Sequence, residues 1–210
     1  MSAAVHAHAT GADHTDLPYV LRAAVKLGIL ESIAVLVIGS VSKYLDGPAE
    51  VGLLAVLVTV AVLLVTLLPG LWTRAATIEG IAGAAGIGLG ATVVFMIVDV
   101  AAFQPFGLYT NRWLEIGGGS NWWYHPVWWM LGTYLPWLGA WILAAQAGKG
   151  GQPSLVSGAI PIVVATLACM VVGVLVHFPG AGWNVGTYGV SFIPGLALAT
   201  TVSVLGARRR

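Results

Sequence analysis

Apolar residues fill six long stretches of the chain, and short polar segments separate these stretches. Each stretch is apolar on all sides, without the alternation of apolar and polar residues typical of transmembrane β-barrel strands. About 20 residues of apolar helix cross the hydrocarbon core of a bilayer, where every backbone N–H and C=O must be paired internally. The pattern therefore predicts an all-α integral membrane protein, a six-transmembrane-helix bundle with spans near residues 21–41, 51–72, 77–103, 122–146, 154–177 and 185–207.

Little of the chain lies outside these stretches. Residues 1–20 are polar and lack the apolar core of a cleavable signal peptide, so we expect a flexible cytoplasmic tail there, and residues 208–210 form a basic C-terminal end. Charged residues make up 8% of the chain and hydrophobic residues 58%, whereas soluble domains carry about 25% charged residues. The net charge of +1 provides no basic surface for nucleic acid.

The basic residues set the predicted orientation. An even number of spans places both termini on one side of the membrane, and positively charged loops favour the cytoplasmic side. Of the nine Lys and Arg residues, only Lys43 and Arg112 fall on the side opposite the termini. We therefore expect both termini to be cytoplasmic, in a bacterial inner (plasma) membrane, with residues 42–50, 104–121 and 178–184 forming the outer surface.

An aromatic segment, NWWYHPVWW, marks the predicted outer end of the fourth span. The fourth span runs inward from this segment, and the fifth returns outward to His177. His125 and His177 should therefore lie at a similar depth, with Asp99, late in the third span, in the same layer. We call this predicted site the outer layer; its members are His125, His177, Asp99 and Trp129.

Two interpretations of the outer layer remain open. In the functional one, His125 and His177 ligate a metal, either a haem iron or copper, Trp129 walls a flat cofactor, and Asp99 orients an imidazole. A lipid, quinone or pigment is an alternative occupant of the same aromatic rim. In the structural one, tryptophan and tyrosine concentrate at the membrane interface for their amphipathic rings, and both histidines occupy ordinary helix ends.

Asp99 and Glu31 are acidic residues inside predicted spans, where charge is costly and a functional role is the first hypothesis. Asp99 lies about one turn from the outer boundary, so an ion pair with Arg112 is an alternative to a role in proton or ion handling. Glu31 is the deepest acid toward the cytoplasmic side. It either handles protons or ions, or forms a salt bridge with Lys26, five residues earlier, or with another basic neighbour.

Small residues recur every four positions in the third span, at Ala82, Gly86 and Gly90. This spacing lets another helix approach closely. It predicts helix packing, either within the chain or with a partner.

Familiar catalytic motifs are missing from the sequence, which has no phosphate-binding loop, HExxH, GxSxG or CxxC. We therefore expect no catalytic activity of the chain by itself. The leading hypothesis is a non-catalytic multi-pass subunit of a larger membrane complex, of an energy-converting respiratory or photosynthetic type, in contact with other membrane subunits and lipids. The alternatives are a haem- or copper-binding redox subunit using His125 and His177, and a small-solute or metal-ion transport component.

Overall fold

The computed structural model describes residues 14–109, 124–148 and 150–208. Within these ranges the chain is helical and has no strand. The elements are α1 (Leu17–Tyr44), α2 (Gly47–Trp72), α3 (Ile78–Val98), the π-helix η1 (Asp99–Phe103), α5 (Tyr124–Gly148), α6 (Leu155–Leu175) and α7 (Val185–Arg208). Five of the helices described, α1, α2, α3 continued by η1, α6 and α7, are long and apolar enough to cross a membrane. They indicate an integral membrane protein built as a helical bundle.

Helix α5 differs from the other five. It is 25 residues long, which exceeds the length needed to cross a bilayer. Its sequence YHPVWWMLGTYLPWLGAWILAAQAG is rich in tryptophan and tyrosine, whose polar N–H and O–H groups make it less apolar than its neighbours. It nevertheless packs against α2, α3 and α7, so it is an internal element of the bundle.

Helix α1 begins at Leu17 and α2 at Gly47, four residues before the predicted starts near 21 and 51. A capping carboxylate and a proline explain the early start of α1, and a proline explains that of α2, where Asp46 makes no side-chain capping bond. The Asp16 carboxylate accepts a hydrogen bond from the Tyr19 backbone N–H at 3.1 Å, and each helix has a proline in its first turn, where the missing N–H costs nothing. The continuous apolar runs begin a few residues after the helices do, because the residues at the helix starts include polar ones.

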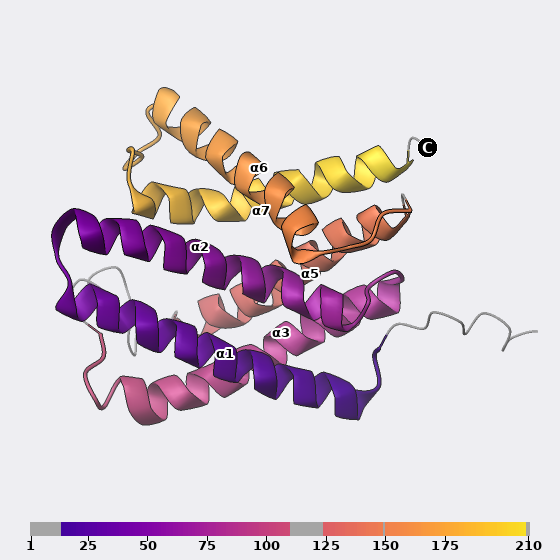
Figure 1. The fold of residues 1–210 in the computed structure, drawn as a ribbon, viewed down its shortest axis with the longest axis horizontal. Helices are drawn as coiled ribbons and strands as arrows, with labels where there is room; N and C mark the ends of the chain where they lie inside the picture. The colour runs from indigo at the N-terminus through magenta and orange to yellow at the C-terminus, as the bar shows by residue number, and fades with distance from the viewer. Residues whose placement is uncertain (1–13, 110–123, 149, 209–210) are drawn as a thin grey trace, which may run out of the picture.

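The helices lie in two groups joined by α5 (Figure 1). Helices α1 and α2 pack against α3, and α6 pairs with α7. The largest apolar core forms between α2, α5, α6 and α7 around Leu67, Ile142, Ile162 and Leu196. Figure 1 shows the start of α1 and the end of α7 at one end of the bundle, with the α1–α2 turn, η1 and the α6–α7 turn at the opposite end.

Glycines allow α5 to approach its neighbours closely. A methyl group at Gly88 of α3 would collide with the Gly132 carbonyl of α5, and one at Gly139 would collide with the Thr66 carbonyl of α2. Of the predicted stripe on α3, Gly90 makes a tight contact within the chain, since a Cβ there would lie 2.8 Å from the Ala24 Cβ. Ala82 and Gly86 are exposed, so packing of a partner against them stays a prediction.

Candidate functional site

Asp99 is fully buried at the junction of α3 and η1. Its carboxylate accepts a hydrogen bond from the Gln104 side-chain amide at 2.7 Å and a second, short one from the Tyr109 hydroxyl. The π-helical turn places an extra residue here, and such turns are frequent at functional sites. In this chain the turn brings Asp99 within reach of donors that follow it in sequence.

Further contacts fix the segment that carries these donors. The Lys43 ammonium at the end of α1 donates to the Gly107 carbonyl at 2.7 Å. The Leu108 side chain packs on Gly39, where a Cβ would lie 2.8 Å from the leucine Cγ. Asp99 thus joins Gln104 and Tyr109 in a polar cluster that holds residues 104–109 against α1 and α3.

Aromatic packing surrounds this polar cluster. The ring of Trp128 lies 5.0 Å from that of Phe95, centroid to centroid, at an interplanar angle of 56°. Phe103 and Met96 complete the buried apolar cluster. Trp129, the residue predicted to wall a cofactor, is 48% exposed, and this role stays a prediction. The adjacent Trp128 is the tryptophan that packs beside Asp99's helix.

His177 lies at a helix end, as the structural interpretation of the sequence predicted. It adopts a left-handed backbone conformation (φ 53°) just after α6. Its N–H donates to the Val174 carbonyl at 3.1 Å, and the next N–H, of Phe178, donates to Gly173 at 2.9 Å. This bonding pattern is a Schellman motif, which terminates helices. The His177 residue itself is exposed.

The predicted pairing of the two histidines remains a prediction. His125 lies in the first turn of α5, but its side chain is outside the described residues. Figure 1 places the start of α5, the end of α6 and η1 toward the same end of the bundle. Among the side chains that are described, no group of three or more His, Cys, Asp or Glu residues could hold a metal ion.

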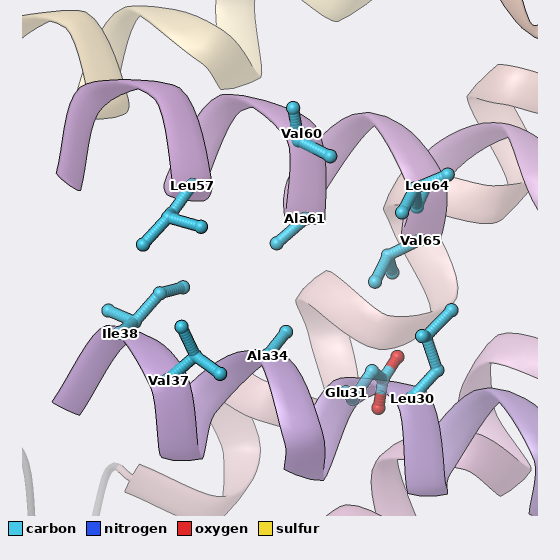
Figure 2. Close-up of a pocket in the computed structure, with 10 residues that line it drawn as sticks. All are labelled: Leu30, Glu31, Ala34, Val37, Ile38, Leu57, Val60, Ala61, Leu64 and Val65. Atoms are coloured by element: carbon cyan, nitrogen blue, oxygen red, sulfur yellow. The ribbon is translucent and has the colours of Figure 1, made fainter. Parts of the chain in front are cut away.

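Glu31 occupies a different setting, the groove between α1 and α2 (Figure 2). The residue lies at the middle of α1, about 20 Å from either helix end at about 1.5 Å per residue. The groove has a volume of about 150 Å³, and Glu31 is the one polar residue that lines it. The other lining residues are Leu30, Ala34, Val37, Ile38, Leu57, Val60, Ala61, Leu64 and Val65.

The Glu31 carboxylate forms no hydrogen bond or ion pair with any residue that the structure describes. The predicted pairing with Lys26 is not formed. Five residues turn an α-helix by about 140° at about 100° per residue, so Lys26 points toward another side of α1. Glu31 is therefore a half-buried carboxylate surrounded by aliphatic side chains.

Comparison with known proteins identifies no relative: no protein-family model matches the chain, and neither a curated protein nor a solved structure is significantly similar to it.

Proposed function

We propose that this protein is a multi-pass subunit of a larger membrane assembly and has no catalytic activity of its own. The observation that carries the proposal is Glu31, a carboxylate in an apolar groove at the middle of α1 that has no hydrogen bond or ion pair with any described residue. A charged side chain at the centre of a membrane helix costs about 2.5–3.5 kcal/mol on insertion scales. A second subunit that covers the groove would reduce this cost.

The exposed surface of α2 supports the same proposal. In the span of α2, only 11% of residues are buried within the chain. Val51, Leu53, Val56 and Val60 all expose large apolar side chains. Lipid tails could cover these apolar side chains. They offer no hydrogen-bond donor, however, to the Glu31 carboxylate in the adjacent groove. The combination of an open apolar face and an unpaired acid favours a protein neighbour.

The proposal includes the membrane topology. All six long helices cross the membrane, α5 included, and both termini lie in the cytoplasm, because the basic residues of the sequence concentrate at that end. A bacterial inner membrane and an energy-converting assembly are the finer parts of the proposal. Attachment of a membrane-impermeant biotin label to single introduced cysteines in a Cys169→Ala background tests the orientation, using positions in the N-terminal tail and at 178–184.

Co-purification is the direct test. The chain is extracted with an affinity tag at its C-terminus from its native membrane in a mild detergent, and the eluate is analysed by native mass spectrometry. We expect one or more other membrane proteins in fixed stoichiometry. An absorbance spectrum of the same eluate tests the energy-converting assignment, because haem or pigment would be visible. Recovery of a stable chain alone from native membranes would reject the proposal.

A further inference from the structure

We propose that the α1–α2 groove receives a transmembrane helix of a different subunit, and that a lysine or arginine of this helix pairs with Glu31. The inference rests on the proposed function, since it requires an assembly, and it specifies the chemistry of the partner.

The groove has room for side chains of a helix that packs across it. Its walls run from Leu30 to Ile38 on α1 and from Leu57 to Val65 on α2, which is about 12 Å along each helix. Val37 and Val60, on opposite walls, are 42% and 49% exposed, so the groove opens outward from the bundle. Two small residues of the walls, Ala34 and Ala61, are of the type that allows close approach of a helix backbone in membranes. Figure 2 shows aliphatic side chains from both helices facing this space, with Glu31 beside Leu30.

The charge of the groove specifies what the helix must carry. Glu31 needs a donor or a cation, and the described ranges 14–109, 124–148 and 150–208 place none beside it. Lys26 points elsewhere, and the other basic residues fall near helix ends or in connections. The nearest hydroxyl along the helix, that of Ser32, already donates to the Gly28 carbonyl at 2.8 Å. Acidic residues inside membranes characteristically pair with other polar or charged groups, so a basic side chain is the complementary partner.

A second copy of this chain does not meet this requirement. A symmetric contact through the groove would bring two Glu31 carboxylates together, and like charges at close range repel. Acyl chains of lipid would fill the apolar volume and leave the acid unpaired. A different subunit with a basic residue in its span satisfies both the shape and the charge.

The first experiment locates the partner. The photo-reactive amino acid p-benzoylphenylalanine is placed at Val60, on the rim of the groove, and at Val164, an exposed residue of α6, as the matched control. After irradiation of native membranes, cross-linked peptides are identified by mass spectrometry. We expect a product from Val60, absent from Val164, whose peptide belongs to an apolar helix containing Lys or Arg. Three results would overturn the inference. The peptide cross-linked to position 60 could come from this chain itself, it could come from a helix without a basic residue, or the probe could give only lipid adducts.

The second experiment tests the charge and the space separately. Glu31→Gln keeps the size of the side chain and removes its charge, and we expect the co-purified partner to fall about tenfold. Ala61→Trp fills the groove and should have a similar effect, whereas Ala168→Trp on the exposed surface of α6 should have none. In a charge exchange, Glu31→Lys is combined with replacement of the partner's basic residue by an acidic one, and we expect this pair to restore binding.

The outcomes separate the two proposals. If other subunits co-purify at full yield with Glu31→Gln and with Ala61→Trp, the groove is not their docking site, and only the inference in this subsection is rejected. If no subunit accompanies the wild-type chain, the proposed function itself is rejected. If Glu31 is protonated and has only a structural role, the yield of co-purified subunits should not change in Glu31→Gln. This result would reject the inference about the groove and leave the proposed function standing.

Discussion

Two acidic residues of helices long and apolar enough to cross a membrane, Asp99 of α3 continued by η1 and Glu31 of α1, lie in opposite kinds of surroundings. Asp99 is fully buried and accepts hydrogen bonds from Gln104 and Tyr109. Glu31 faces an apolar groove without a partner in the described part of the chain. The difference distinguishes an acidic residue that stabilises the fold from one that we propose binds another subunit. A polar group that the fold satisfies stabilises the fold, whereas one that the fold leaves unsatisfied indicates a contact the isolated chain does not make.

The packing of the two regions differs in the same way. Around Asp99, helices α3 and α5 meet through glycines, and segment 104–109 closes over α1. Between the middle parts of α1 and α2, aliphatic side chains leave an open groove. The comparison therefore predicts large effects on stability from substitutions in the closed region and small ones from substitutions in the groove, when the chain is purified alone.

Replacement of Asp99 by alanine should have the largest effect on stability. The change removes from the interior the carboxylate that accepts hydrogen bonds from the half-buried Gln104 amide and Tyr109 hydroxyl, and hydrogen bonds to a charged group each contribute about 1.5–3 kcal/mol. We expect a loss of that size or larger in thermal unfolding of the purified chain in detergent. Asp99→Asn, which keeps an acceptor oxygen, should lose less. Unchanged stability in Asp99→Ala would contradict the claim that the hydrogen bonds of Asp99 stabilise the fold.

Gly132→Ala should be the next largest change. A Cβ at this position would collide with the Thr92 side chain of α3, and overpacking of a tight contact costs about 1–3 kcal/mol. Gly52→Ala is the matched control, because a Cβ at Gly52 of α2 meets nothing within 4 Å. Unfolding midpoints of the two variants should differ clearly, and equal midpoints would contradict the close approach of α3 and α5.

Tyr109→Phe should have an intermediate effect. It removes one hydrogen bond to Asp99 and keeps the ring, so we expect a loss of about 1 kcal/mol. Limited proteolysis should show faster cleavage near residues 104–109, because this segment depends on the Asp99 cluster. Cleavage as slow as in the wild-type chain would show that Lys43 and Leu108 hold the segment without help.

Glu31→Gln should leave the purified chain as stable as the wild type, within about 0.5 kcal/mol, because no interaction within the described fold is lost. Thermal unfolding in detergent, run beside Asp99→Asn, measures the contrast between the two acids directly. A large loss of stability in Glu31→Gln alone would mean that the carboxylate has a partner within its own chain.

His177→Gly should act in the opposite direction, with a gain in stability of a few tenths of a kcal/mol up to about 1 kcal/mol, because glycine adopts the left-handed conformation of this position without strain. The same variant tests the predicted metal or haem site. If the native complex carries a haem or copper signal and the variant loses it while remaining folded, His177 is a ligand as well as a helix terminator.

Most of the fold could be predicted from the sequence, because apolar length alone determines which segments cross a bilayer. The predicted end of the second span at residue 72 and the start of the sixth at residue 185 agree with α2 and α7. The partners of Asp99 could not be predicted, since Gln104 and Tyr109 reach it only through the π-helical turn and the fold of the following segment. The groove at Glu31 could not be predicted either. Its existence depends on how side chains separate α1 from α2, which periodicity does not encode.

Helix α5 has a consequence for how the protein is made. Among the six long helices described, α5 is the one that falls short of a candidate span, yet α2, α3 and α7 all pack on it. In the proposed topology its insertion therefore depends on neighbours synthesised before and after it. Ribosome-stalled chains that end before α7 should hold α5 only loosely in the bilayer, and the bundle becomes resistant to extraction once the last helix has emerged.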